Sequence, residues 1–545
     1  MSNKDRASGM TWSGIPLRHS YGPAEARPRD YATELGEPGR PPFTRAGHAE
    51  MYRKRLWITR QLAGLDTAAA TNARLRYLIE HGQTGLAIVP DTPTQLALDS
   101  DHPLGARSAG TQGVPLCTVD DMERMLEGID LQNVTASFSV PGVSVPVLLA
   151  QLLAVADRRG IPYSALRGSF QNDPLQATHT SYDAGTPLDL GMRLCVDTME
   201  YCARSVPGFH PTTVNAYDLR ESGLNAPQEI GVAISMAKAY IEATLERGVT
   251  IDQVGPGILL ICGAHIDLFE EVAKFRAARR IWARMMRDHF HAANERTCRL
   301  TLAVHTAGSS LYAPQPINNV IRGTVEALAA VLGGCQGLDL SAYDEPVDLP
   351  SEQAAMVALR TQQILALEAG VGNVADPLGG SWYVEELTDE VERRTIAVMN
   401  EIDSLGGMVA AAKAGWLRRL MDEGQWALQK SIETGERPIV GVNCHRIPPE
   451  RDTLLTFRGE HPAPSQEQVD IVRKHRRTRD VGRVRDALGP LGAQAKTREN
   501  LIPSIKLAVE AGATVGEVLG TIRVANGLSY DPVGAIDART TLGGC

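Results

Sequence analysis

Aromatic residues are scarce in this 545-residue chain, at 5% of its positions. Proteins that hold single-stranded nucleic acid stack the bases on aromatic side chains, so a platform of that kind is not expected. Positive net charge is missing as well, because the formal net charge is −9 at pH 7. Neither nucleic acid nor an anionic membrane is therefore expected as a partner.

Long hydrophobic runs are also missing. The chain has no stretch of 18 apolar residues, and its first residues, MSNKDRASGM, contain no apolar signal core. The eight cysteines are dispersed and form no C-x-x-C pair. This spacing predicts free, buried thiols with no structural metal and no disulfide framework. Together these absences predict a cytoplasmic protein without a membrane span.

Three common catalytic signatures do not occur: G-x-S-x-G, G-x-x-x-x-G-K-[ST] and H-E-x-x-H. The usual serine hydrolases, P-loop nucleotide enzymes and helical zinc proteases are therefore not indicated. Any chemistry must come from another arrangement of polar residues.

What the chain does have is material for a large core, with 43% hydrophobic and 22% charged residues. Short apolar runs alternate with long amphipathic segments such as 270–287 and 351–367. Eight such strands predict an α/β protein with a (β/α)8 TIM barrel, and a doubly wound open sheet is the alternative. The predicted strands are Gly85–Pro90, Thr135–Val140, Ala165–Phe170, Thr212–Tyr217, Gly257–Ile261, Leu300–Val304, Gly337–Leu340 and Asn373–Asp376.

Three regions are predicted. Residues 1–45 are rich in Pro, Gly, Arg and Glu and predict an extended N-terminal arm, either docked on a partner subunit or disordered. Residues 46–400 form the barrel, and 401–545 form a mainly helical C-terminal region. The basic run VRKHRRTRDVGRVRD in this last region is interpreted as a solvated helix face rather than a polyanion site.

Polar residues gather just after the predicted strands, which is where active sites of parallel barrels lie. Asn and Asp at such places commonly cap the next helix, and this alternative applies to Asn172 and Asp173. Gln171 needs no capping role, so a ligand contact is favoured for it. Arg55 and Arg60 either pair internally or bind phosphate, and the sequence leaves both open.

Eight ordered segments resemble one family: RLWITRQLAG, DTPTQLALDSDHP, GSFQNDPLQ, AYDLRESG, FRAARRIWA, INNVIR, ALRTQQI and VADPLGGSWYVEEL. They are similar to the substrate-binding subunit of the adenosylcobalamin-dependent acyl-CoA mutases, the methylmalonyl-CoA mutase family. The resemblance extends over about residues 10–530. It implies a barrel that admits an acyl-CoA substrate, adenosylcobalamin as the cofactor, and a radical rearrangement of the carbon skeleton.

Members of this family bind cobalamin through a D-x-H-x-x-G loop, and this sequence contains no such loop. The resemblance therefore implies a large subunit that works with a separate small cobalamin-binding subunit, as in the isobutyryl-CoA and 2-hydroxyisobutyryl-CoA mutases. The expected assembly is a hetero-oligomer that contains a dimer of large subunits.

The resemblance also implies roles for individual residues. Catalytic roles fall on Gln171, Tyr217 and Asp218. Substrate-binding roles fall on Arg55, Arg60, Leu62, Val89, Ser169 and Ser181, and cofactor-binding roles on Gln95, Glu221, Gln336 and Glu368.

Among the positions that depart from the family pattern, four concern the acyl group of the substrate. Leu62 and Ser181 stand where the methylmalonyl enzymes have a tyrosine and a carboxylate-binding arginine, and Val89 stands where the 2-hydroxyisobutyryl enzyme has an aspartate. A second substrate carboxylate would be unpaired in such a pocket, so a neutral branched acyl group is expected. Asp218 replaces a histidine and could donate a hydrogen bond only with a raised pKa. Two alternatives stay open: a mutase for an unusual thioester or non-CoA substrate, and a catalytically silent partner.

Overall fold

The computed structural model describes residues 9–24, 26–140, 142–179, 185–347, 350–451 and 462–536. They form an α/β protein with parallel sheets, as predicted, and the chain divides into two compact units. Unit 1 comprises Met1–Gln61, Val214–Ala239 and Leu259–Glu460, and unit 2 comprises Leu62–Thr213, Tyr240–Ile258 and His461–Cys545.

The sheet of unit 1 has five strands, in the order β1-β10-β9-β8-β7. These strands are β1 (Ile58–Arg60), β7 (Thr212–Asn215), β8 (Ile258–Ala264), β9 (Thr301–Thr306) and β10 (Gly337–Asp339). The register places Arg60 beside Asp339, Asp339 beside His305, and His305 beside Gly263. Partners in a parallel register project to the same face, so this row sets polar groups along one face.

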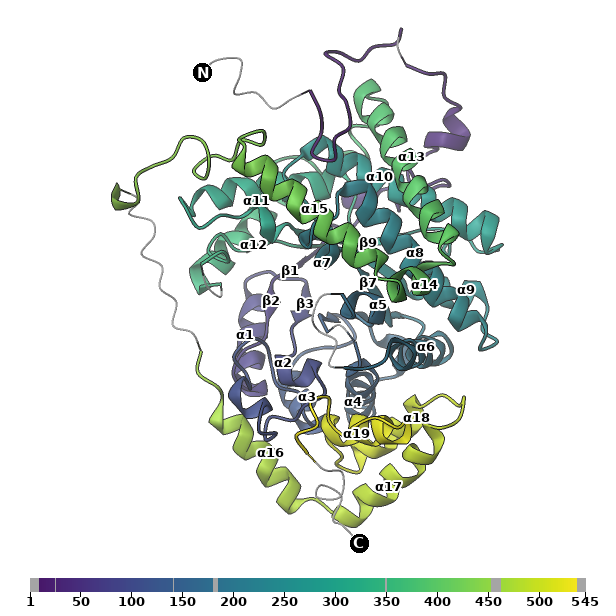
Figure 1. Cartoon of the computed structure of the whole chain (residues 1–545), viewed down its shortest axis with the longest axis vertical. Coiled ribbons are helices and arrows are strands. Elements are labelled where there is room, and N and C mark those ends of the chain that lie inside the picture. The colour runs from purple at the N-terminus through teal and green to yellow at the C-terminus, as the bar shows by residue number, and fades with distance from the viewer. Residues whose placement is uncertain are drawn as a thin grey trace. The chain divides into compact units, whose positions relative to one another are not determined.

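Helices of unit 1 follow or precede these strands (Figure 1). α10 packs along α13, and it carries charged residues that are fully buried, among them Arg276 and Lys274. Each is paired: Arg276 with Asp376 and Glu385, and Lys274 with Glu229 at 2.7 Å. The helices are α7 (Ala216–Glu221), α10 (Leu268–Arg284), α11 (Asn318–Leu332), α12 (Glu352–Leu367), α13 (Trp382–Ser404), α14 (Met408–Lys413) and α15 (Trp416–Glu433), and α8 (Ala226–Leu245) passes from unit 1 into unit 2.

The N-terminal arm lies against unit 1. The backbone N–H groups of Trp12 and Ser13 donate to Asp267 at 3.0 Å and to Glu270 at 3.1 Å. The guanidinium of Arg437 lies 3.8 Å from the centre of the Trp12 ring, a cation–π contact. The described part of the arm is therefore ordered on its own chain, and a role at a partner subunit stays a prediction.

Unit 2 has a second parallel sheet, in the order β2-β3-β4-β5-β6. Its strands are β2 (Leu62–Ala63), β3 (Gly85–Ile88), β4 (Thr135–Phe138), β5 (Gly168–Phe170) and β6 (Phe209–His210). The apolar helix α4, buried from Val145 to Ala156, packs against α18. The helices are α1 (Ala68–Glu80), α2 (Thr92–Gln95), α3 (Val119–Met125), α4 (Val145–Arg158), α5 (Pro174–Ala177), α6 (Leu188–Ser205), α9 (Ile251–Val254), α16 (Gln466–Thr478), α17 (Val481–Gln494), α18 (Ile502–Glu510) and α19 (Val515–Ala525).

The basic run on α16 is partly used inside unit 2. Arg476 pairs with Asp99, Asp101 and Glu517, at 2.5, 2.9 and 2.5 Å. Asp99 also accepts hydrogen bonds from the Thr514 hydroxyl and the Gly516 N–H. This network joins the loop after β3 to α16 and to the start of α19.

One predicted strand is wrong. The structure has turns, not a strand, at Asn373–Asp376, and Asp376 has a positive φ of 50° while its carboxylate accepts from Arg276 and Arg45. The remaining predicted strands coincide with β3, β4, β5, β7, β8, β9 and β10. The strands missed by sequence reasoning are β1, β2 and β6, which are too short for an alternating pattern to appear. Tyr217, predicted at a strand end, lies in α7 instead.

Two features that the sequence predicted to be absent, a membrane span and a disulfide framework, are described here only for the residues that the structure describes. Among those residues, no helix is both long enough and apolar enough to cross a bilayer. The seven cysteines that the structure describes are free thiols.

Candidate functional site

α7 begins where β7 ends, so its side chains stand at the carboxyl edge of the unit 1 sheet. Asn215, the last residue of β7, caps the helix by accepting the Asp218 N–H at 3.0 Å. Tyr217, Asp218 and Glu221 all lie on this short helix and are half-buried. Three of the predicted site residues are thus brought together by one cap and one turn of helix.

β9 supplies a histidine to the same place. The ring of His305 lies 4.5 Å from the ring of Tyr217, with the planes tilted by 35°. The Nδ1 of His305 is 2.8 Å from the carbonyl oxygen of Thr306. A carbonyl can only accept, so Nδ1 carries the hydrogen. The imidazole is fixed in orientation, and its Nε2 makes no hydrogen bond to a described residue.

Two more carboxylates complete this group. Glu221 accepts from the backbone N–H of Ser309 at 2.6 Å and from its hydroxyl at 2.9 Å. Glu345, in the loop after β10, accepts from the Ala342 N–H at 2.7 Å. We call Tyr217, Asp218, Glu221, His305 and Glu345 the α7 cluster; its members come from the carboxyl ends of β7, β9 and β10.

The electrostatics of the α7 cluster favour protonated carboxyls. Burial raises the pKa of Asp218 to about 6, although the hydrogen bond with Asn215 and the charge of His305 act in the opposite direction. Burial likewise raises the pKa of Glu221 and of Glu345, and the charge of His305 again opposes the shift. Burial also holds the pKa of the Tyr217 hydroxyl well above 10.

A carboxyl of this group can donate a hydrogen bond to a neutral oxygen when it is protonated, which for Asp218 is below about pH 6. Titratable groups with shifted pKa values in one place are typical of functional sites. The arrangement suits binding and orienting a carbonyl group.

The predicted site residues of unit 2 lie in or near the strands of that unit's own sheet, toward their carboxyl ends. Ser169 is buried in β5, and Gln171 follows that strand directly, with its Nε2 3.5 Å from the Oε1 of Gln176. Asp173 caps α5, as the capping interpretation predicted, and Asn172 donates to the Cys195 carbonyl at 3.4 Å. The Gln95 Nε2 donates to the Pro90 carbonyl at 2.6 Å, while its Oε1 is buried without a partner among the described residues.

The two apolar residues predicted for the acyl pocket belong to neighbouring strands of unit 2. Leu62 is in β2 and pairs in register with Ala87 of β3, and Val89 follows β3 directly. Leu62 is 47% exposed, so a large apolar side chain is available for contact with a ligand. Ser181 lies outside the described residues.

Four other predicted residues are not part of the α7 cluster. Arg60 is buried and paired with Asp339 at 2.6 Å, which is the internal pairing that the sequence left open. Arg55 is exposed. Gln336 precedes β10, at the opposite edge of the sheet, and bonds the Leu302 N–H and the Gly334 carbonyl. Glu368 is exposed at the end of α12, and turns and bends, not a strand, occupy residues 371–380 after it.

Sequence reasoning missed His305 and Glu345. His305 stands near the end of a β-branched run, TLAVHT, that was predicted to end at Val304. Glu345 follows β10 after five intervening residues, LSAYD. The rule that polar groups after strands mark the working edge would have selected both.

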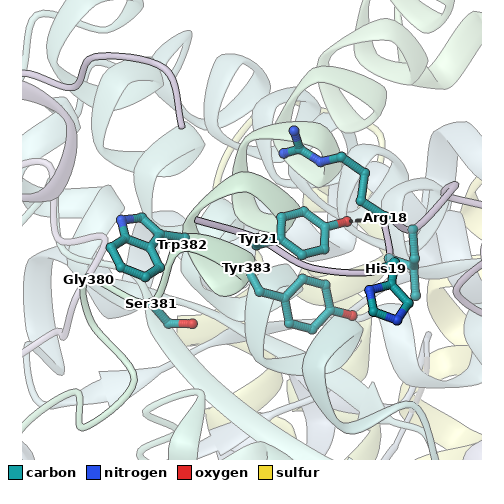
Figure 2. A pocket seen from close by; sticks show the side chains of 8 residues that line it. Arg18, His19, Tyr21, Gly380, Ser381, Trp382 and Tyr383 are labelled. Atoms are coloured by element: carbon teal, nitrogen blue, oxygen red, sulfur yellow. Dashed lines mark hydrogen bonds between the residues drawn. The ribbon is translucent and has the colours of Figure 1, made fainter. Parts of the chain in front are cut away.

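A cavity of about 550 Å³ lies elsewhere in unit 1 (Figure 2). Arm residues Arg18, His19 and Tyr21 line it together with the start of α13, and the Tyr21 and Tyr383 rings are 4.9 Å apart. The Arg18 side chain is paired with Glu386. None of the predicted site residues lines this cavity, so we place the chemistry at the α7 cluster, on the strand ends.

Comparison with known proteins shows the family of this chain. A family model described as methylmalonyl-CoA mutase matches residues 10–528. The chain is 35% identical over 514 residues to the 2-hydroxyisobutanoyl-CoA mutase large subunit of Aquincola tertiaricarbonis, covering 94% of this chain and 91% of that one. It is 34% identical over 516 residues to the methylmalonyl-CoA mutase of Escherichia coli (strain K12), covering 95% of this chain and 72% of that enzyme.

Proposed function

Because this chain belongs to the methylmalonyl-CoA mutase family, whose barrels are of the TIM type, we propose that it is the large subunit of an adenosylcobalamin-dependent acyl-CoA mutase. Such an enzyme is an isomerase that rearranges the carbon skeleton of an acyl-CoA. The observation that carries the proposal is the α7 cluster, which sets protonatable groups at the carboxyl ends of three strands of one sheet, β7, β9 and β10.

One side chain of this chain fits a contact with adenosylcobalamin. The Oε1 of Gln95 is buried and has an unfilled acceptor position within the described part of the chain, and the rim of a corrin carries amide N–H donors. Bound adenosylcobalamin supplies the radical that starts the rearrangement. This chain's part is to bind the thioester, to hold a hydrogen-bond donor at its oxygen and to exclude water.

The cobalt ligand is expected from a second chain, because the 545 residues contain no D-x-H-x-x-G loop. We therefore predict that this chain alone binds adenosylcobalamin weakly and that a small cobalamin-binding subunit completes the site. Titration followed by the cobalamin absorption spectrum measures this directly. Tight, stoichiometric binding by the chain alone would contradict the two-subunit proposal.

The substrate is proposed to be a neutral branched acyl-CoA. Leu62 and Val89 are apolar, and neither position offers a basic side chain; Leu62 is in β2, and Val89 directly follows the neighbouring strand β3. A relative is named for 2-hydroxyisobutanoyl-CoA, a neutral branched thioester. An apolar pocket stabilises a branched acyl group by burial and provides no ion-pair partner for a second carboxylate.

Because the pocket is apolar, we expect the enzyme to prefer neutral thioesters to charged ones. An unpaired carboxylate in this pocket costs several kcal/mol, so kcat/KM for methylmalonyl-CoA should be about a thousandfold below that for isobutyryl- or pivalyl-CoA. The assay uses the chain reconstituted with the small subunit and adenosylcobalamin. Leu62→Arg is the matched variant, because it offers the missing cation and should narrow the difference. A wild-type preference for methylmalonyl-CoA would disprove the assignment of the pocket.

A further inference from the structure

Glu326, on α11, is a buried carboxyl that lacks a cation of its own. It is 0% exposed, and neither side-chain oxygen has a hydrogen-bond partner among the described residues. Arg322, one turn earlier on the same helix, donates instead to the Asn319 side chain and the Val440 carbonyl, each at 2.7 Å. Tyr312, which also responds to the charge of Glu326, is neutral because burial raises its pKa. An unpaired carboxylate is strongly disfavoured in such a place, so this position favours the neutral acid.

The charges that act on Glu326 from other helices are negative. Burial raises the pKa of Glu326 well above 4.5, and the charges of Glu221 on α7 and Glu271 on α10 raise it further. The cations near Glu271 are already used, because Lys274 pairs with it and Arg220 pairs with it at 3.2 Å. The surroundings of Glu326 therefore give it no reason to ionise.

A neutral Glu326 has a hydrogen to donate, and the turn after β9 offers an acceptor. This turn is η8 (Gly308–Ser310), and the Ser310 hydroxyl lies close enough to act on the pKa of Glu326 as a hydrogen-bonding group. The Ser310 hydroxyl donates its own hydrogen to the Ala307 carbonyl at 2.9 Å. Its oxygen can still accept a hydrogen bond, and a protonated carboxyl can supply one.

The same turn holds two members of the α7 cluster. Ser309 donates its backbone N–H and its hydroxyl to Glu221, at 2.6 and 2.9 Å. A Cβ atom at Gly308 would lie 3.3 Å from the Tyr217 hydroxyl oxygen and 3.3 Å from the Glu221 Oε2, so the backbone of η8 lies against both side chains. A shift of η8 would therefore displace both Tyr217 and Glu221.

We propose that Glu326 is a positioning residue for the α7 cluster: as a neutral carboxylic acid it donates a hydrogen bond to the Ser310 hydroxyl oxygen and so keeps η8 against Tyr217 and Glu221. This inference deepens the proposed function and rests on it. Glu326 is fully buried, so it acts through η8 and not on the substrate, and no bond is made or broken at it. Small displacements of groups that orient a substrate lower the rate strongly.

Two substitutions separate positioning from packing. Glu326→Gln keeps the shape of the side chain and an amide that can donate, whereas Glu326→Met keeps an unbranched shape without a donor. In the reconstituted enzyme, we expect kcat to stay within about threefold of the wild type for Glu326→Gln and to fall about tenfold for Glu326→Met, with KM little changed in both. Glu423→Gln, at an exposed position of α15, is the control and should match the wild type.

The stability of the same variants distinguishes positioning from a merely structural role. Replacing a buried carboxyl by an apolar group of similar volume is often neutral or stabilising, so Glu326→Met should unfold at a urea concentration at least as high as the wild type. Equal kcat for the Gln and Met variants would overturn the proposal, and so would a loss of kcat in Glu326→Met that is accompanied by a lower urea midpoint. A failure of the proposed function would appear instead as no turnover by the wild type.

The neutral state of Glu326 can be tested without turnover. Because its pKa is raised above 4.5 in the folded chain, the native carboxyl keeps its proton while the unfolded one loses it as the pH rises. The wild type should therefore lose stability relative to Glu326→Gln between about pH 5 and pH 8, which urea titrations at several pH values would show as a widening gap between the midpoints. A gap that does not change with pH would show that Glu326 is ionised in the folded chain and would overturn the proposal.

Discussion

Replacing Arg276 by methionine should destabilise unit 1 by about 3–5 kcal/mol, the usual cost of removing one partner from a buried ion pair. The Arg276 side chain is 0% exposed and bonds two carboxylates, Asp376 and Glu385, which are 1% and 3% exposed. Methionine has a similar volume but no charge. Two buried carboxylates would lose their shared cation, and the turn that positions Asp376 would lose its main contact.

Tryptophan fluorescence measures the unfolding of unit 1 separately from that of unit 2. All six tryptophans, at positions 12, 57, 282, 382, 416 and 426, belong to unit 1, so a urea titration of the intrinsic fluorescence reports on that unit. Arg393→Met is the matched control, because its pair with Glu390 is 68% exposed at the arginine and should contribute less than about 1 kcal/mol. Equal midpoints for the two variants would show that the Arg276 pair contributes little.

Asp218→Ala should lower turnover about a hundredfold and leave the fold intact, because it removes a hydrogen-bond donor from the α7 cluster. Alanine keeps the Asp218 backbone N–H that the Asn215 side chain accepts in the cap of α7, although the side-chain hydrogen bond between Asp218 and Asn215 is lost. A far-ultraviolet spectrum identical to that of the wild type checks the fold. Turnover equal to the wild type at every pH would leave Asp218 with no part in the reaction.

The raised pKa of Asp218 sets the direction in which turnover should change with pH. The pKa of Asp218 is raised from 3.8 to about 6, so its carboxyl is protonated below that value and loses its proton as the pH rises through it. The component of the rate that depends on a neutral Asp218 should therefore fall with rising pH. Asp218→Asn keeps a donor that does not titrate, so it should retain part of the activity and lose that component. A wild-type profile that rises through pH 6 would contradict this sign.

The class of fold was predictable because strand and helix patterns alternate clearly. The run ILLICGA of β8 and the charged but amphipathic α10 are each long enough to show their period. β1 and β2, with three and two residues, are too short to show one. The apolar residues within Asn373–Asp376 suggested a strand. A buried hydrogen bond between Asp376 and Arg276, which is remote in sequence, stabilises a turn there instead.

The site was partly predictable for a related reason. Tyr217, Asp218 and Glu221 are close in sequence, so one motif, AYDLRESG, brings them together on α7. His305 and Glu345 join them only through the order of strands in the sheet, which composition does not reveal. Glu368 was selected by resemblance to the family, and the structure places it, exposed, at the end of α12. Arg60 pairs with Asp339 because β1 and β10 are neighbours, which no local pattern indicates.

The most direct test of the proposed function is isomerisation by the reconstituted enzyme. The chain, a small cobalamin-binding subunit and adenosylcobalamin are mixed with isobutyryl-CoA, pivalyl-CoA and methylmalonyl-CoA, and the products are separated by chromatography and mass spectrometry. The account predicts a rearranged isomer of unchanged mass from a neutral branched thioester, formed only when both subunits and the cofactor are present. Absence of an isomer from every thioester, with the small subunit bound and the cofactor loaded, would contradict it.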